Sequence, residues 1–259
     1  MPANKDTKIT LYWLEKSRSQ RIVWLLEELD LTYDLETFKR QPDLLAPPEL
    51  KKIHPLGKSP VITLERPGKK KITLAESAVI TEYLCEHFGG DKLIPKKFAE
   101  GDGKAEKGGE EEIGEESEEW MRYRYLMHYT EGSLMPFLVM QLVMDQVKDP
   151  PIPFFVKFLP RIVASQVEKA FLTRNIFAHF DFLENMLQTA PEGGPWFCGK
   201  NLSAADIMLS FPLIAASRRV PLGDKYPLVV KYVERIQKEE GYQRAIKKVE
   251  EIEGKFEAI

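Results

Sequence analysis

A serine stands between a β-rich stretch and a helical stretch in "LYWLEKSRSQRIVWLLEEL", residues 11–29. The residues before Ser17 predict a strand, and the apolar spacing after it predicts one face of a helix. A hydroxyl and the positive end of a helix dipole at one point favour a bound anion. Ser17 is therefore a candidate for anion chemistry. The plainer alternative is that Ser17 is the N-cap of the helix, a common use of serine.

A proline heads a strand-like run in "HPLGKSPVITL", residues 54–64. Because proline cannot donate a ladder hydrogen bond, Pro60 fits at a strand's first residue, at an edge or at a bulge. An X-Pro bond takes the cis form at small cost. A cis bond between Ser59 and Pro60 would turn the backbone N–H and C=O of Ser59 outward. Those groups could then pair with the backbone of a bound peptide.

The overall composition excludes several classes of protein. The chain has 259 residues, of which 43% are hydrophobic and 30% charged, as in ordinary soluble globular proteins. A net charge of -3 argues against nucleic acid as the main partner. The most apolar stretch, residues 134–144, is too short to span a bilayer, and residues 1–14 do not resemble a signal peptide. We expect a soluble cytoplasmic protein, with no membrane association.

The remaining chemistry-bearing residue types suggest no metal or redox centre. Cys85 and Cys198 form neither a disulfide framework nor a metal-spaced pair, and we interpret both as structural. The four histidines lie far apart in the sequence, with no cluster of ligands around them. The prediction is that the protein holds no metal.

The elements that must position these residues alternate between strand and helix up to about residue 95. We predict strands at 8–14, 32–38, 60–65 and 71–75, helices at 19–31 and 76–89, and a loop with a short helix at 41–57. Pro67 and Gly68 suit the turn between the last two strands, and Gly89 ends the second helix. The order is β-α-β-(loop)-β-β-α, which defines a first domain over 1–95.

The next segment separates two domains. Residues 99–119 are mostly glycine and carboxylate, and such a segment cannot bury enough apolar surface to order itself. We interpret 96–119 as an acidic linker or insert, with an acidic interaction arm as the alternative. Residues 120–259 have helical periodicity and form an all-helical domain, in which Ser203 and Asp206 make a capping box.

Three motifs in this order resemble those of the glutathione S-transferase family. "HPLGKSPVITL" is similar to the family's Asn-Pro-x-Gly-x-Val-Pro-x-Leu, with His54 replacing asparagine and Ser59 replacing valine. "LAESAVITEYL" and "LSAADIMLSFPL" resemble the family's helix starts in the two domains. The loop around Ser17 most resembles the serine-type, fungal cytosolic branch. The resemblance implies a thioredoxin-like α/β domain followed by an all-α bundle, with glutathione as co-substrate, a homodimer, and a role in detoxification and stress response.

The resemblance also implies roles for individual residues. Ser17 would hold the glutathione sulfur as a thiolate, with Arg18 beside it, while Ser19 and Tyr12 remain competitors for that role. The expected glutathione-binding residues are His54, Lys58, Ser59, Pro60, Glu76 and Ser77. The expected electrophile pocket comprises Trp13, Leu14, Tyr123, Met127 and Phe137. A simpler structural interpretation is available for these residues: part of a helix start, a solvent-exposed lysine, or a residue of the core.

Three functions follow from these residues. The first is an enzyme that conjugates glutathione to small hydrophobic electrophiles, with peroxidase activity toward hydroperoxides as an addition. The second is a non-catalytic binding or assembly module on the same fold, with the acidic insert as its interaction arm. The third is an isomerase like the zeta branch, whose signature has consecutive serines and a cysteine that "KSRSQR" lacks.

Overall fold

The computed structural model describes residues 4, 6–98, 113–220 and 222–257. Its first part is a mixed sheet of four strands in the order β2-β1-β3-β4, where β1 is Lys8–Leu14, β2 Tyr33–Phe38, β3 Val61–Glu65 and β4 Ile72–Ala75. β1 runs parallel to β2 and antiparallel to β3, which runs antiparallel to β4. With α1 (Ser19–Glu28) and α2 (Ser77–His87), this order confirms the predicted thioredoxin-like fold.

The strand register brings the segments singled out in the sequence to one edge of the sheet. Tyr12 of β1 lies opposite Val61 of β3, and Val61 lies opposite Ala75 of β4. The end of β1, the start of β3 and the end of β4 therefore meet. Residues 15–18, 58–60 and 76–77 adjoin these three ends, so the loop with Ser17 faces the other two motifs.

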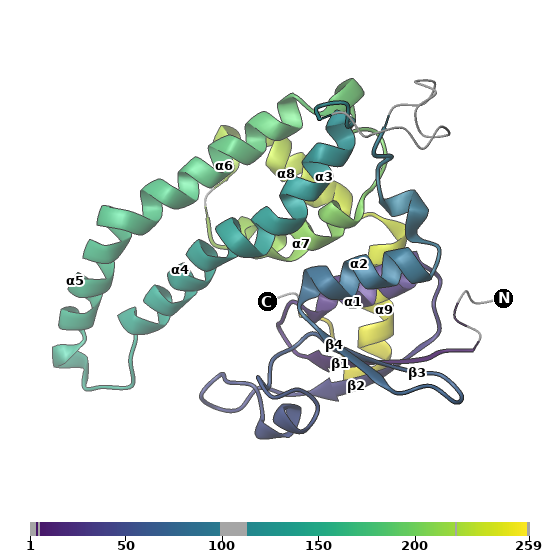
Figure 1. Ribbon diagram of the computed structural model, residues 1–259. Coiled ribbons are helices and arrows are strands. Elements are labelled where there is room, and N and C mark those ends of the chain that lie inside the picture. Colours follow the sequence, from purple (N-terminus) through teal and green to yellow (C-terminus); the bar gives the residue numbers. More distant parts are fainter. Residues whose placement is uncertain (1–3, 5, 99–112, 221, 258–259) are drawn as a thin grey trace.

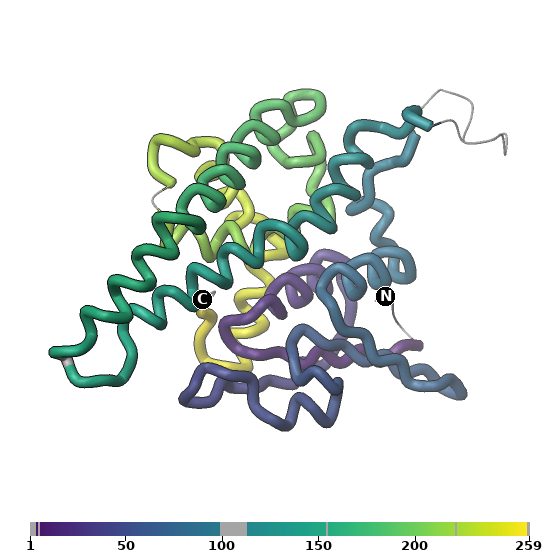
Figure 2. Tube along the Cα trace, turned by 60° about the vertical axis from the view of Figure 1, so that its left-hand side comes forward, coloured from purple at the N-terminus to yellow at the C-terminus, as the bar shows by residue number. Residues whose placement is uncertain are grey.

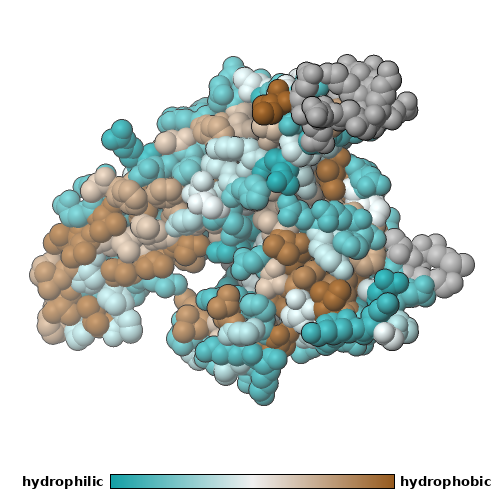
Figure 3. All heavy atoms as spheres, in the orientation of Figure 1, coloured by the Kyte–Doolittle hydropathy of each residue, from teal (hydrophilic) through white to brown (hydrophobic). Residues whose placement is uncertain are grey.

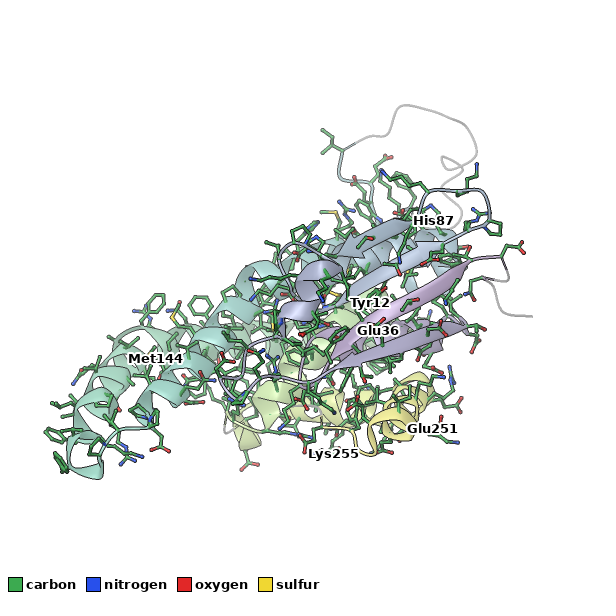
Figure 4. All side chains as sticks on the ribbon, turned by 90° about the horizontal axis from the view of Figure 1, so that it is seen from below. Tyr12, Glu36, His87, Met144, Glu251 and Lys255 are labelled. Carbon is green, nitrogen blue, oxygen red and sulfur yellow. The ribbon has the colours of Figure 1, made fainter. Side chains whose placement is uncertain are left out.

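The two faces of the sheet are covered differently. Alternation along β1 sends Ile9, Leu11 and Trp13 into the main core, on the side of α1 and α2 (Figure 1). Tyr12 instead packs with Leu50 on the opposite face, beneath the segment that follows β2. Figure 4 views the sheet from below and labels Tyr12 with its β2 neighbour Glu36.

The second part is helical, as predicted. It comprises α3 (Glu118–Tyr129), α4 (Met135–Lys148), α5 (Phe158–Val167), α6 (Thr173–Gln188), α7 (Ala204–Ser217), α8 (Pro227–Ile236) and α9 (Glu240–Glu253). The predicted capping box of Ser203 and Asp206 begins α7. α3 begins two residues before the expected domain start, with Ser117 as its N-cap. Residues 99–112 of the predicted insert lie outside the described residues.

Two of these helices form an arm that projects from the rest of the protein. α4 and α5 run side by side and pack on each other, and Figures 1 and 2 show the pair extending away from the body. Figure 3 shows apolar residues along this arm and a hollow between it and the first domain. In the described part of the chain, no helix is long and apolar enough to cross a membrane.

The first helix is buried on more sides than its sequence pattern predicts. The pattern gives α1 one apolar face, yet every residue from Ser19 to Leu26 is buried. The reason is that α7 and α9 also pack on α1. The approach of α9 is close, since a Cβ at Gly241 would lie 3.0 Å from Trp24 Nε1. The chain's last helix thus completes the core of the first domain.

Candidate active site

Ser17 lies in the turn between β1 and α1, with its side chain almost enclosed. Its Oγ donates a hydrogen bond to the carbonyl oxygen of Leu14 at 2.7 Å and accepts one from the backbone N–H of Ser19 at 3.2 Å. The residue at the N-cap position is Arg18, whose side chain makes no capping bond. The Ser17 hydroxyl therefore links the end of β1 to the first turn of α1. Ser17 is 7% exposed.

Two further hydroxyls continue from Ser17 to the cis-proline loop. The Ser17 and Ser19 Oγ atoms are 2.7 Å apart, and Ser19 Oγ also bonds Ser59 Oγ. Ser59 Oγ donates in turn to the Tyr12 carbonyl oxygen at 2.8 Å. The Ser59–Pro60 bond is cis, which confirms that prediction. Ser19 is fully buried between the Ser17 turn and the cis-proline loop.

The backbone that carries Ser17 is held by one arginine from the segment after β2. Arg40 Nε donates to the Glu15 carbonyl oxygen at 3.2 Å, and Arg40 Nη2 donates to the Lys16 carbonyl oxygen at 3.0 Å. Its backbone N–H also donates to the Glu15 carboxylate at 2.7 Å. Lys16 pairs with Glu257 near the chain's end at 2.7 Å. These contacts fix the turn before the first residue of α1.

A carboxylate of the helical domain joins two arginines that flank the serines. Glu131 lies in the π-helical turn Thr130–Leu134 that links α3 to α4. It pairs with Arg18 at 2.8 Å and with Arg21, whose side chain is fully buried. Burial lowers the pKa of the Arg21 guanidinium, and the Glu131 charge opposes that shift. Arg18, Arg21 and Glu131 together place two positive charges and one negative charge beside the Ser17 turn.

The expected carboxylate-binding segment lies at the end of β4. Ser77 is buried as the first residue of α2, so the free N–H groups of that helix start beside it. Glu76 is exposed and has φ 71°, a conformation that a non-glycine residue adopts at a cost of about 1–3 kcal/mol. Nothing in the sequence indicated this backbone strain, which accompanies functional sites.

The other two expected glutathione ligands lie on the loop before Pro60. Lys58 is exposed, and no ion pair to it occurs among the described residues. His54 is half-buried, and its ring Nδ1 is enclosed without a hydrogen-bond partner in the described part of the chain. The register places this loop beside the Ser17 turn, since Tyr12 lies opposite Val61.

An apolar cavity of about 100 Å³ opens next to Lys16, one residue from Ser17. Its lining comes from α4 of the projecting arm and from α7. The lining residues are Lys16, Met135, Leu138, Val139, Gln141, Leu142, Phe211, Ala215, Ala216, Arg219 and Val220. The cavity therefore lies between the two domains and beside the serine turn.

The structure places the five residues expected to form an electrophile pocket in the protein core or packed against it. Trp13, Leu14, Tyr123 and Met127 are each at most 3% exposed and belong to the protein core. Phe137 is half-buried and packs on Phe171 and His179, with ring centroids 5.7 and 5.1 Å away. The physical reason is that α3 packs on α7, which encloses the side chains on that face of α3. None of the five lines the cavity beside Lys16.

Tyr12 and the two cysteines are not placed for thiol chemistry at this edge. Tyr12 directs its ring to the opposite face of the sheet, where its hydroxyl lies 3.5 Å from Thr63 Oγ1. Cys85 is buried in α2, and desolvation raises the pKa of its thiol to about 12. Burial also raises the pKa of the Cys198 thiol. Within the described residues, no three His, Cys, Asp or Glu side chains are grouped to hold a metal.

Comparisons with known proteins match both parts of the chain to one family. The model of the glutathione S-transferase N-terminal domain matches residues 17–87, and that of the C-terminal domain matches residues 151–248. The chain is 35% identical to Glutathione S-transferase 1 of Saccharomyces cerevisiae over 251 residues, which are 96% of this chain and 98% of that protein. The chain belongs to the glutathione S-transferase family. It is also 33% identical to Glutathione S-transferase 3 of Schizosaccharomyces pombe, covering 81% of this chain and 75% of that protein.

Solved glutathione transferase structures share the fold. A glutathione S-transferase from Actinobacillus pleuropneumoniae is 27% identical, with a TM-score of 0.65, and the match covers 93% of this chain and 92% of that one. A glutathione transferase homologue from Lodderomyces elongisporus holds two glutathione molecules per subunit. It has a TM-score of 0.64 at 16% identity, with 92% and 97% of the two chains covered. These matches confirm the predicted fold and the predicted fungal relatives.

Sequence reasoning missed three residues that shape this candidate site. Arg40 holds the Ser17 turn, while Arg21 and Glu131 link that turn to the helical domain. Arg21 is a charged residue in a buried stretch of α1, where a partner is required, but that burial comes from tertiary packing and not from the sequence pattern. The identity of that partner, 110 residues away, had no local signal.

Proposed function

We propose that this glutathione transferase binds glutathione at the sheet edge, ionises its thiol and conjugates glutathione through its sulfur to small apolar electrophiles. The observation that carries the proposal is the Ser17 hydroxyl at the N-terminus of the buried helix α1, linked through Ser19 to Ser59 of the cis-proline loop. A thiol has an ordinary pKa of about 8.5, and a hydroxyl donor with a helix N-terminus lowers it. The thiolate is the nucleophile in the transfer.

Each part of glutathione has a matching group at this edge. The Ser59 backbone N–H and C=O, which the cis-proline geometry exposes, would pair with the cysteinyl backbone of glutathione. The γ-glutamyl carboxylate would lie at the start of α2, on Ser77 and its N–H, with Glu76 next to the ammonium group. Lys58 and His54 would meet the glycyl carboxylate. Arg18, held on Glu131, would add positive charge near the sulfur.

The cavity beside Lys16 is the proposed place of the electrophile. Its apolar lining would take up the hydrophobic part of a substrate, and its place one residue from Ser17 would bring the electrophilic atom to the sulfur. The sulfur would form a bond to the electrophilic atom of the substrate. In a substitution a leaving group departs, and in an addition water supplies a proton. With a hydroperoxide in the same place, the thiolate would attack the terminal oxygen, releasing the alcohol and leaving the sulfenic acid of glutathione. A second glutathione would then form the disulfide, with release of water.

The direct test is a pH titration of the ultraviolet thiolate absorbance of glutathione with stoichiometric protein, followed by a conjugation assay. We expect the bound thiol to ionise at least one pKa unit below free glutathione, which equals about 1.4 kcal/mol. Glutathione that binds without ionising, or that does not bind, would leave a non-catalytic module on this fold as the better description. The homodimer, the cytoplasmic location and the detoxification role remain predictions.

Substitution in the cavity should separate the two substrates. Leu142→Glu places a carboxylate on the α4 lining, and we expect a rise of about 10-fold or more in the KM for an apolar electrophile, because that charge must be desolvated. The KM for glutathione should stay within a factor of two. The matched control is Val143→Glu, one residue along the same helix, 44% exposed and outside the cavity. Equal effects of the two variants would contradict this placement of the electrophile.

A further inference from the structure

We infer that Ser19 is a positioning residue for the proposed thiolate chemistry: its hydroxyl, held between Ser59 and Ser17, determines how strongly Ser17 donates to the glutathione sulfur. The inference rests on the proposed function and assigns a role to a fully buried side chain that cannot itself reach solvent. It also makes the hydroxyl of Ser59, next to the cis-proline, a competitor for the proton of Ser19.

The argument begins with the number of protons in the chain of hydroxyls. Four contacts run from Leu14 to Tyr12: Leu14 O to Ser17, Ser17 to Ser19, Ser19 to Ser59, and Ser59 to Tyr12 O. The two ends are carbonyl oxygens, which only accept, and each of the three hydroxyls has one proton to donate. Three protons serve four contacts, so one contact lacks a proton at any moment.

In the arrangement that satisfies both carbonyls, Ser17 donates to Leu14 and Ser59 donates to Tyr12. Ser19 then has one proton and two neighbouring acceptors, the Oγ atoms of Ser17 and Ser59. The proton of Ser17 is meanwhile engaged by the Leu14 carbonyl oxygen. Ser17 can donate to a sulfur only after its hydroxyl rotates away from that carbonyl.

A bound thiolate changes this balance, because an ionised acceptor forms a stronger hydrogen bond than a carbonyl oxygen. The Ser17 proton would rotate from Leu14 to the sulfur, and the proton lost by the thiol would leave to solvent water. Ser17 Oγ still accepts from Ser19, and a hydroxyl that accepts a hydrogen bond is a better donor. The Ser19 proton thus strengthens the bond that stabilises the thiolate, without touching the sulfur.

Removal of the Ser19 hydroxyl and removal of the Ser59 hydroxyl should therefore affect the pKa of bound glutathione differently. In Ser19→Ala, Ser17 keeps only the backbone N–H of residue 19 as a donor, so the pKa of bound glutathione should rise by about half a unit. In Ser59→Ala, Ser19 has Ser17 as its only hydroxyl acceptor, so the pKa should stay or fall. The Ser59 backbone, which would bind the cysteinyl group, is retained in that variant.

The titratable and charged groups around the sulfur site are the same in both variants. They are Glu15, Lys16 and Arg18 on the turn, Arg40 and Glu257 bonded to that turn, Arg21 on α1, Glu131 on the π-helical turn, Lys58 and His54 on the cis-proline loop, and Glu76 at the start of α2. A difference in thiolate pKa between the variants therefore reports the hydroxyl chain. A purely structural role for Ser19 would lower stability without shifting that pKa.

The experiment is the ultraviolet thiolate titration of glutathione bound to wild type, Ser17→Ala, Ser19→Ala, Ser59→Ala and the Ser17→Ala/Ser19→Ala double variant. We expect Ser19→Ala to raise the pKa in the wild-type background and to have no effect once Ser17 is replaced, because Ser19 acts through Ser17. An unchanged pKa in Ser19→Ala, or an equal rise in both backgrounds, overturns the inference. If wild type itself shows no ionisation, the proposed function fails first. Circular dichroism of each variant checks that it is folded.

Discussion

Ser17→Ala should reduce kcat/KM for glutathione conjugation by about 10- to 100-fold at pH 6.5. The Ser17 hydroxyl would lose its hydrogen bond to an ionised sulfur, and such a bond contributes about 1.5–3 kcal/mol. Loss of the bond raises the pKa of the bound thiol, since the stabilised form is the anion. The deficit should therefore be largest below the wild-type thiol pKa and shrink as the pH passes that of the variant. A pH–rate profile of both proteins measures it.

The fold and the glutathione affinity should survive this substitution. Ser17 Oγ bonds Leu14 O and Ser19 within the turn, so alanine removes contacts worth about 1 kcal/mol of stability. The Kd for glutathione should change less than 3-fold, because the proposed backbone and carboxylate contacts remain. Ser165→Ala on α5 is the matched serine control and should keep wild-type turnover. Wild-type kcat/KM in Ser17→Ala at low pH would remove Ser17 from the mechanism.

Glu131→Ala should reduce the free energy of unfolding by about 3 kcal/mol, because it leaves the fully buried Arg21 guanidinium without a counter-charge. Glu131 also holds Arg18 on the edge of the site, and that contact is lost in the variant. The cause is the cost of an unpaired buried charge, which exceeds the gain from the pair itself. Urea denaturation followed by circular dichroism measures the change.

Two further variants separate that cause from a general loss of surface charge. Asp34→Ala breaks an ion pair with Lys8 in which both side chains are more than 60% exposed, and we expect no measurable shift of the midpoint. Arg21→Met/Glu131→Leu removes both charges of the pair. This double variant should regain most of the stability that Glu131→Ala loses. A double variant as unstable as Glu131→Ala would contradict the buried-charge explanation and indicate packing as the cause.

The sequence alone predicted the order of elements because each local signal is set by nearby residues. Pro60 at the head of a strand indicated the cis bond, and Ser203 with Asp206 indicated the start of α7. Ser17 was recognised for the same reason, since a strand end and a helix start adjoin it. The segments around Ser17, Pro60 and Ser77 could also be placed at one site, because they resemble segments of a known family.

The cavity beside Lys16 could not be derived in this way. Aromatic and methionine residues near the expected domain interface, such as Tyr123 and Met127, have the same helical spacing whether they line a pocket or fill a core. Only the packing of α3 on α7 decided that they are core, and only the course of α4 along the projecting arm placed Leu138 and Leu142 beside Lys16. Figure 4 shows that arm, with Met144, extending away from the sheet.

The sequence by itself thus determined the fold, the cis-proline loop and the serine turn. The tertiary structure decided that Ser19 is enclosed, that Tyr12 faces away from Ser17, and that Arg21 pairs with Glu131. Ser19 meets Ser59 across 40 residues, and Arg21 meets Glu131 across 110. Contacts at such separations depend on strand register and on how the two domains pack, and neither is encoded in the spacing of neighbouring residues.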